Sequence, residues 1–428
     1  MTSMMHYLGF GAGAPKTDIP PANEQTRVRA LPAPWYTSEE MYSLERRAIF
    51  SRRWLFMTHS SRLQDAGDWL RYNVAGYDLI IIRDRQGNIN AFHNVCRHRA
   101  YPVIEKEKQG NAAILACRYH GWSYGFNGKL AKATGFKDMS ELEKQQNSLF
   151  RIHTKIDKNG FIWINMDSKD EPEVPWEEHF RDVDVQERYE PLNFDNYVLD
   201  HVYELEGDYN WKILADNFNE CYHCPTTHKD IPTFLNLDSF DSDLKDGHIQ
   251  HHCAYTSQQL EKGYNVSSTY YFPNSSMSVS PHWLMVQKFL PNGPKKSSMH
   301  YEIYRNKNSS EEDFRAIADM YARVMAEDKV LCDKAQQNLN TGVFINGQLH
   351  PKFEKAPIFF QNTVREVITE HYKREKAEGS EVWPARQNLP ANAQVADGSM
   401  TCGFRAVSRN LQCFDHVFGD AFVAIWHR

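Results

Sequence analysis

The chain has 428 residues, of which 41% are hydrophobic, 13% aromatic and 24% charged, and its formal net charge is −6 at pH 7. This length is enough for about two domains of a globular protein, and the modest negative charge without a dense basic run excludes a nucleic-acid-binding surface. No apolar stretch reaches the roughly 18 residues of a transmembrane helix, and the first residues resemble neither a secretory signal nor a transit peptide. We therefore expect a cytoplasmic protein that does not enter membranes.

The first part of the chain is predicted to be an arm followed by a small all-β domain. Residues 1–35 are rich in Gly, Pro and Ala, and Thr37 with Glu40 forms a possible capping box for a helix over residues 38–50. We assign the arm to 1–35 and the β domain, with its leading helix, to 36–170. Turn signals separate the predicted strands, which cover residues 69–74, 78–83, 89–94, 112–117 and 160–165.

The second part begins after residue 170 with an acidic, proline-containing segment, EPEVPWEE, which is predicted to be a linker. The region 171–428 is predicted to be one domain that mixes strands and helices, so the fold class of the chain is α+β. Residues 375–398 are charged and then rich in Pro, Ala and Asn, and are predicted to be a surface insertion. The expected strands cover 197–205, 267–272 and 299–304, and the longest expected helix covers 311–339.

Cysteine and histidine alternate in two short segments that the β domain is expected to present as loops. Cys96 and His98 lie in the first segment, and Cys117 and His120 in the second. A zinc finger usually pairs Cys with Cys and His with His, whereas here each segment carries one of each residue type. This arrangement favours a [2Fe–2S] cluster with two thiolates on one iron and two imidazoles on the other, and a zinc site is the alternative.

A second group of candidate ligands lies in the stretch DNFNECYHCPTTH, residues 216–228. His223 and His228 are five residues apart, which on a continuous helix would point them about 140° apart. Pro225 disfavours helix at the residue before it, so His223 is expected to end a helix while His228 returns from the following loop. Glu220 is expected to share the helical face of His223.

Two histidines need a carboxylate to complete the facial triad that holds non-haem Fe(II) with positions open for O₂. The helix over 311–339 has an apolar stripe, and Asp328 falls on that stripe between Val324 and Leu331. A buried, ionised aspartate is costly unless it is paired or binds a metal, so Asp328 is the predicted third ligand. Asp333 lies off the stripe and is the alternative.

Cys221 and Cys224 form a C-x₂-C pattern within the same stretch, which can indicate zinc or redox chemistry. No second C-x₂-C pattern accompanies it, and both cysteines are interleaved with the candidate iron ligands. They are therefore predicted to pack around the site.

The motifs CRHRA…CRYHGWSYGFNGKL, DNFNECYHCPTTH and MAEDKVLCDKAQQNL resemble those of Rieske non-haem iron oxygenase alpha subunits. The resemblance implies a Rieske domain followed by a helix-grip-like α+β catalytic domain with a central antiparallel sheet. It implies a cluster on Cys96, Cys117, His98 and His120, and Fe(II) on His223, His228 and Asp328. Most of the family has Asp where this chain has Glu220, the residue that bridges to a cluster histidine of a neighbouring subunit, and Glu at this position resembles the choline, carnitine and betaine monooxygenase branch.

The resemblance also implies a monooxygenase that takes O₂ and electrons supplied from NAD(P)H by a separate reductase or ferredoxin. It implies a homotrimer, or a multiple of one, and a quaternary ammonium substrate. Choline would be oxidised to betaine aldehyde, and a betaine would be N-demethylated. Two alternatives remain at this point: an oxygenase of a secondary metabolite, and an electron-transfer protein without catalysis. Aromatic side chains attract a trimethylammonium group, and the candidates, each of which is more often ordinary core, are Tyr270, Tyr271, Phe272 and Trp283.

Overall fold

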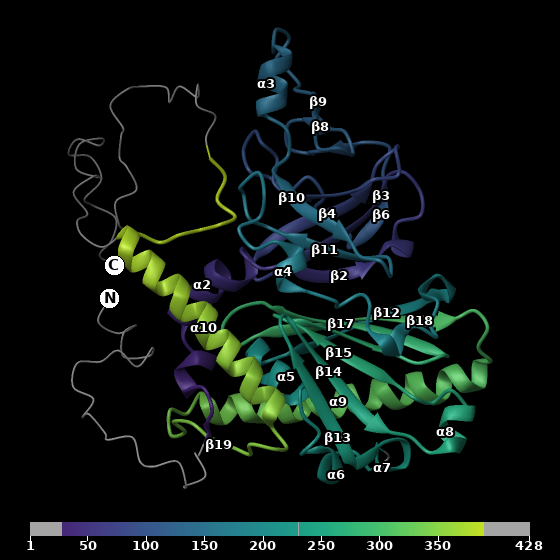
Figure 1. Ribbon diagram of the computed structural model, residues 1–428. Helices are drawn as coiled ribbons and strands as arrows, with labels where there is room; N and C mark the ends of the chain where they lie inside the picture. The colour runs from purple at the N-terminus through teal and green to yellow at the C-terminus, as the bar shows by residue number, and fades with distance from the viewer. Residues whose placement is uncertain (1–27, 230, 389–428) are drawn as a thin grey trace, which may run out of the picture.

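Two antiparallel sheets of seven strands organise the chain, and the computed structural model describes residues 28–229 and 231–388 (Figure 1). The first sheet has the order β2-β11-β10-β5-β4-β3-β6 and lies in the upper half of the view. A three-stranded sheet, β7-β8-β9, extends it upward. The bounds are β2 Leu55–His59, β3 Asp68–Val74, β4 Tyr77–Arg83, β5 Ile89–His93, β6 Gln109–Asn111, β7 Leu115–Ala116, β8 Ser123–Tyr124, β9 Leu130–Lys132, β10 Arg151–Ile156 and β11 Phe161–Asn165.

The second sheet has the order β12-β18-β17-β16-β15-β14-β13, and every neighbouring pair is antiparallel. The α+β class and the central antiparallel sheet are therefore confirmed. The long helix α9 (Glu311–Leu339) lies along one face of this sheet, beside α5 (Trp211–Phe218). The strand bounds are β12 Tyr197–Gly207, β13 Asn236–Lys245, β14 His248–Ala254, β15 Ser267–Tyr271, β16 Ser275–Val279, β17 Trp283–Pro291 and β18 Ser297–Asn306.

Most of the expected elements are present, with three differences near their ends. The predicted strand 112–117 is wrong, because β6 ends at Asn111 and β7 covers only Leu115–Ala116. The capping residue of the first long helix is Ser38 rather than Thr37, since the Ser38 hydroxyl accepts from the Met41 N–H at 3.2 Å. That helix, α2 (Glu39–Glu45), continues as a π-helical turn, η2 (Arg46–Phe50).

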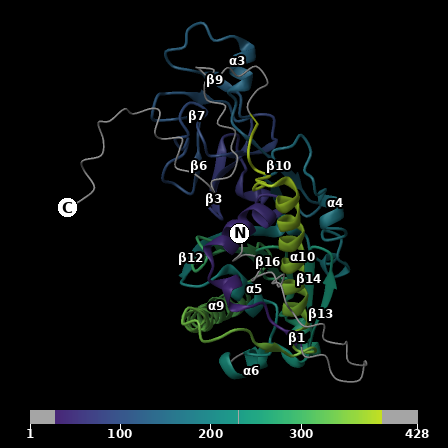
Figure 2. The ribbon, with the colours of Figure 1, turned by 90° about the vertical axis from the view of Figure 1, so that its left-hand side faces the viewer.

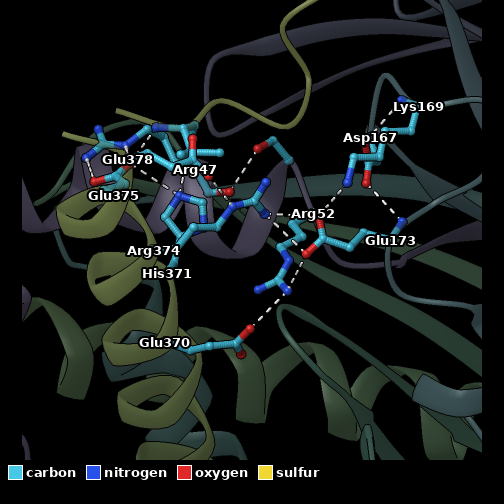
Figure 3. A network of polar contacts seen from close by, with 12 residues as sticks. Arg47, Arg52, Asp167, Lys169, Glu173, Glu370, His371, Arg374, Glu375 and Glu378 are labelled. Carbon is cyan, nitrogen blue, oxygen red and sulfur yellow. Dashed lines mark hydrogen bonds and ion pairs between the residues drawn. The ribbon is translucent and has the colours of Figure 1, made fainter. Parts of the chain in front are cut away.

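The acidic segment after residue 170 packs closely against the rest of the protein. Trp176 is 7% exposed, and its ring lies 5.8 Å from that of Trp163 on β11. Glu173 accepts from Arg52 at 2.7 Å and from Arg374 on α10 (Lys355–Glu378) at 3.0 Å (Figure 3). The segment therefore joins the end of the first domain to the C-terminal helix.

The prediction of a surface insertion over 375–398 is wrong for its first residues, because α10 continues to Glu378. Glu375 is nearly buried and accepts from Arg47 of η2 at 2.6 Å (Figure 3). Helix α10 runs down the side of the molecule from the first domain to the second sheet (Figure 2). Residues 1–27 of the predicted arm and 389–398 of the predicted insertion lie outside the described residues. Among the helices described, none combines the length and apolar character that a bilayer-spanning segment needs.

The two domains are joined by a buried charge network centred on Glu302 of β18. Successive side chains of β18 face opposite sides, so Tyr301 faces α9 while Glu302 faces the first domain. The Glu302 carboxylate is fully buried, and burial alone would raise its pKa, but the charges of Lys288 and Arg62 lower that pKa below the ordinary value. Lys288 and Arg62 lie 3.0 and 2.9 Å from it, and three hydroxyl groups donate to it, those of Thr58, Tyr72 and Tyr304.

We expect Glu302→Ala to lower the free energy of unfolding by about 3–5 kcal/mol, because it leaves two buried cations without their counter-ion. Denaturant unfolding, followed by circular dichroism, measures this change. The matched control is Glu177→Ala, which removes an exposed pair with Lys155 and should cost less than about 1 kcal/mol. Equal effects of the two substitutions would contradict the role given to Glu302.

Candidate metal centres

Two loops of matching conformation carry the predicted cluster ligands. The two loops, 96–101 and 117–122, have the same two backbone hydrogen bonds. The N–H of the cysteine donates to the carbonyl of the sixth loop residue, and the N–H of the fifth loop residue donates to the carbonyl of the cysteine. The accepting turn places Ala100 at φ 57° and Gly121 at φ 71°. Ala100 carries only a methyl group and Gly121 has no side chain, which suits this left-handed region. The sequence thus builds two equivalent turns that present one Cys and one His each.

The side chains of these loops form two like pairs. The Nδ1 atoms of His98 and His120 lie 3.1 Å apart, and both rings are half-buried. Cys96 and Cys117 are free thiols, each 2% exposed, and the Cys96 sulfur lies 3.3 Å from the Tyr124 hydroxyl. Two inward thiols and two outward imidazoles that face each other through the same nitrogen are the donor set of a Rieske cluster. The donor types present therefore fit this group.

The second group of ligands is placed by the turn between α5 and α6 (Cys224–Thr227). His223 is the residue that precedes α6, and His228 is the residue that follows it. The expectation that His223 ends a helix is wrong: α5 ends at Phe218, and Pro225 lies in the first turn of α6, where its missing N–H costs nothing. The short helix α6 thus brings the rings of His223 and His228 next to each other.

The structure brings His223, His228 and Asp328 together into a nearly equilateral triangle. The two Nε2 atoms lie 3.2 Å apart, and the Asp328 Oδ1 atom lies 3.3 Å from His223 Nε2 and 3.1 Å from His228 Nε2. Ligand atoms that bind one ion at about 2.1 Å and at right angles lie about 3.0 Å from each other. The triangle therefore has the size of a facial 2-His-1-carboxylate site.

The electrostatics of the triangle suit a divalent cation. Asp328 is 7% exposed, and burial alone would raise its pKa, but hydrogen bonds from His223 and His228 lower it below the ordinary value. Burial would lower the pKa of His223, whereas Asp328 and Glu220 together raise it to about 10. The carboxylates thus favour positive charge at this point, which a divalent cation bound to the neutral imidazoles would supply. Asp333 takes no part, because it pairs with Lys329 at 2.6 Å.

Each histidine of the triangle has a carboxylate next to Nδ1, the ring nitrogen that faces away from the triangle. Glu220 lies 2.5 Å from His223 Nδ1, and Glu327 lies 2.7 Å from His228 Nδ1. Glu220 reaches His223 across a turn rather than along a helical face, because residues 219–223 are not helical. Glu327 was missed in the sequence analysis, although its position next to Asp328 is a signal. Asn217 was also missed: its Nδ2 atom lies 3.4 Å from both His223 Nε2 and Asp328 Oδ1.

We expect Glu327→Ala to weaken Fe(II) binding by about 10- to 100-fold, because the acceptor that fixes the ring orientation of His228 is removed. Competition with a coloured chelator measures the dissociation constant. The control is Glu327→Gln, whose amide oxygen still accepts from Nδ1 and should retain most of the affinity. An alanine variant with unchanged affinity would contradict this role.

The C-x₂-C cysteines are joined to each other. Cys221 and Cys224 form a disulfide with a Cα–Cα distance of 5.0 Å, so the prediction that they only pack around the site missed a covalent link. The aromatic candidates from the sequence all belong to the core. Tyr271 packs on Phe56 of β2, away from α9, and Trp283 stacks on Tyr321 with ring centroids 4.6 Å apart.

Comparison with known proteins finds two family matches that divide the chain as its two sheets do. Residues 53–143 match the Rieske [2Fe-2S] domain, and residues 194–263 and 247–370 match the ring hydroxylating alpha subunit (catalytic domain). Together the two matches cover more than half of the chain. A Rieske domain joined to this catalytic domain defines an iron-dependent oxygenase.

The chain belongs to the Rieske non-haem iron oxygenases, as an alpha subunit. It is 29% identical to choline monooxygenase from Atriplex hortensis over 79% of this chain and 77% of the relative. It is 25% identical to the carnitine monooxygenase oxygenase subunit from Acinetobacter pittii over 73% and 85% of the two chains. Its cofactors are a Rieske cluster and a mononuclear iron, used with O₂ and an external supply of electrons.

Two solved structures show the same fold. A quaternary ammonium Rieske monooxygenase in complex with L-carnitine has a TM-score of 0.69 and 24% identity, over 80% of this chain and 96% of that chain. Naphthalene 1,2-dioxygenase with bound indole has a TM-score of 0.66 and 20% identity, over 80% and 92%. The two-domain architecture is therefore shared with oxygenases of quite different substrates.

Proposed function

We propose that this protein hydroxylates a quaternary ammonium compound, such as choline or a betaine, at the site formed by His223, His228 and Asp328. The observation that carries the proposal is the triangle of these ligand atoms, found in a chain whose relatives are named for choline and carnitine oxidation. When bound, the cluster supplies single electrons and the mononuclear iron activates O₂. A betaine would be N-demethylated, and choline would give betaine aldehyde.

The side chains around Asp328 suit a cationic substrate. Tyr203 and Tyr301 stack with centroids 4.5 Å apart on the sheet face that meets α9. Burial raises the pKa of Tyr301, with further contributions from Tyr203, Tyr209 and Asp328, so these groups lie within electrostatic reach of one another. The hydroxyl groups of Tyr203 and Tyr209 are buried without a hydrogen-bond partner among the described residues. Tyr203 is the partly buried ring of this group, and it replaces the sequence candidates as the aromatic side chain that a trimethylammonium group could contact.

We further propose that the cluster of one chain serves the iron site of another. Strands β7 and β8, which flank the second cluster loop, lie in the upper part of the molecule, and α6 lies at the lower end (Figures 1 and 2). Exposed rings surround both ends: Tyr119 and Phe136 near His120, and Tyr222 and Phe353 near Glu220. A head-to-tail ring, such as a trimer, covers both sets. The reductase or ferredoxin partner and a cytoplasmic location stay predictions.

The substrate proposal is tested with the purified protein, a compatible reductase, NADH and O₂. Choline, glycine betaine and carnitine are compared with 3,3-dimethylbutan-1-ol, the neutral isostere of choline. We expect at least one of the cations, and not the neutral isostere, to couple NADH oxidation to a hydroxylated or demethylated product. Equal turnover of the isostere, or no coupled turnover of any quaternary ammonium compound, would reject the proposal.

A further inference from the structure

The Cys221–Cys224 disulfide lies inside the proposed iron site. Cys221 follows Glu220 directly, and Cys224 follows His223 and opens α6. Cys224 is 5% exposed, so its side chain is buried. None of the steps assigned above uses this disulfide.

The Cys224 sulfur is also within reach of the metal position. The donor atoms of His223, Cys224 and His228 all lie within 4.8 Å of one another. While Cys224 is bonded to Cys221, its sulfur cannot be a thiolate, and thiolate is the form in which cysteine binds metals. The disulfide therefore withholds a thiolate that lies close to two of the candidate ligands.

We propose that the Cys221–Cys224 disulfide decides which metal ion this site holds. With the disulfide intact, two imidazoles and one carboxylate leave positions open, the arrangement of a non-haem Fe(II) site. With the disulfide reduced, the Cys224 thiolate becomes available as a ligand beside His223 and His228. Thiolate ligands favour zinc, and a protein ligand added at this point takes a position that O₂ or substrate would need. This inference rests on the proposed iron site.

The chemistry balances with a dithiol as the reductant. The dithiol transfers two electrons and two protons, the S–S bond breaks, two thiols form, and the dithiol becomes a disulfide. When zinc binds, the Zn–S bond forms and the Cys224 thiol proton passes to the solvent. Reoxidation by hydrogen peroxide would reverse the first step, with two molecules of water as the product.

Two serine variants separate the ligand from the covalent link. Cys221→Ser and Cys224→Ser both remove the disulfide, so any loss of stability from the broken link is shared. Only Cys221→Ser leaves a sulfur at position 224. A difference in metal binding between the two variants therefore reports the Cys224 sulfur itself.

The test uses full-length protein that keeps its cluster, verified by EPR and sulfide content, after mild chelation of the mononuclear iron. One portion is reduced with dithiothreitol, which is then removed by gel filtration; zinc is added to reduced and untreated protein, and zinc-edge X-ray absorption is recorded for both. We expect nitrogen and oxygen ligands only in the disulfide form and in Cys224→Ser. Reduced wild type and Cys221→Ser should each gain one sulfur ligand at about 2.3 Å.

A zinc shell without sulfur in every form would overturn the inference and leave the proposed iron site standing. A sulfur ligand in Cys224→Ser would overturn it as well, because another thiol would be responsible. If zinc bound to none of the forms, the proposed metal site itself would fail, and this inference with it.

Discussion

Protein carrying Asp328→Ala should be isolated with its [2Fe–2S] cluster and without its mononuclear iron, and should show no substrate turnover. Asp328 is the one carboxylate that lies within 3.3 Å of both ligand histidines among the described residues. Two imidazoles alone give a weak Fe(II) site, and the charge that balances the cation is lost. Iron should fall from about three to about two atoms per chain, with two sulfides retained.

The control for this prediction is Asp333→Ala, on the same helix. Asp333 accepts from the Asp208 N–H at 2.9 Å and pairs with Lys329. This ion pair is partly exposed, so its loss should lower the free energy of unfolding by at most about 1 kcal/mol. This variant should keep about three irons and its turnover. Full iron content in Asp328→Ala, or iron loss in Asp333→Ala, would show that the third ligand is assigned wrongly.

Glu220→Ala should keep its cluster, should hold the mononuclear iron when Fe(II) is supplied in excess, and should lose turnover. The Glu220 carboxylate contacts Nδ1 of His223, the nitrogen that faces away from the metal position, and accepts from the backbone N–H of Tyr222, whose side chain is exposed. It is therefore placed to connect His223 to a neighbouring chain rather than to hold the ion. Metal analysis, with the rate at which the reduced cluster is reoxidised by O₂ and substrate, measures the two properties separately.

Glu220→Asp is the matched variant, since it keeps the charge at a shorter reach and should retain part of the reoxidation rate. Glu327→Gln provides a second comparison, because Glu327 contacts the other histidine and is assigned to ring orientation only. It should leave the reoxidation rate close to that of the wild type. A Glu220→Ala protein that turns over normally would exclude the bridging role.

The ligand types were predictable because the chemistry constrains them locally. A cysteine and a histidine on each of two short loops indicate one cluster whatever the fold around them, and Asp328 is conspicuous as an acid on an apolar helical stripe. Glu327 was not conspicuous, because it lies one residue away, off the stripe, and is partly exposed. Its role depends on where His228 points, and that depends on the three-dimensional return of α6.

The fold was predictable where patterns are regular and less so where contacts are distant. Helix α9 has the predicted ends, since its 3.6-residue periodicity is long and Ser310 caps it. Strand β17 was not predicted: all nine of its residues are buried, so it lacks the alternation that marks a half-exposed strand. The role of α10 escaped prediction because its partners, such as Arg47 for Glu375, lie more than 300 residues earlier in the sequence.

The buried Glu302 network has a consequence for how the protein works as a catalyst. A cluster domain on a loose tether could swing toward the iron of its own chain, but two buried cations and three hydroxyls fix this one to the catalytic sheet. Under the proposed transfer between chains, an isolated chain would hold both metals and yet not turn over substrate. If the cluster of one chain serves the iron of another, as proposed above, specific activity should depend on protein concentration and fall on dilution, while the metal content per chain stays constant.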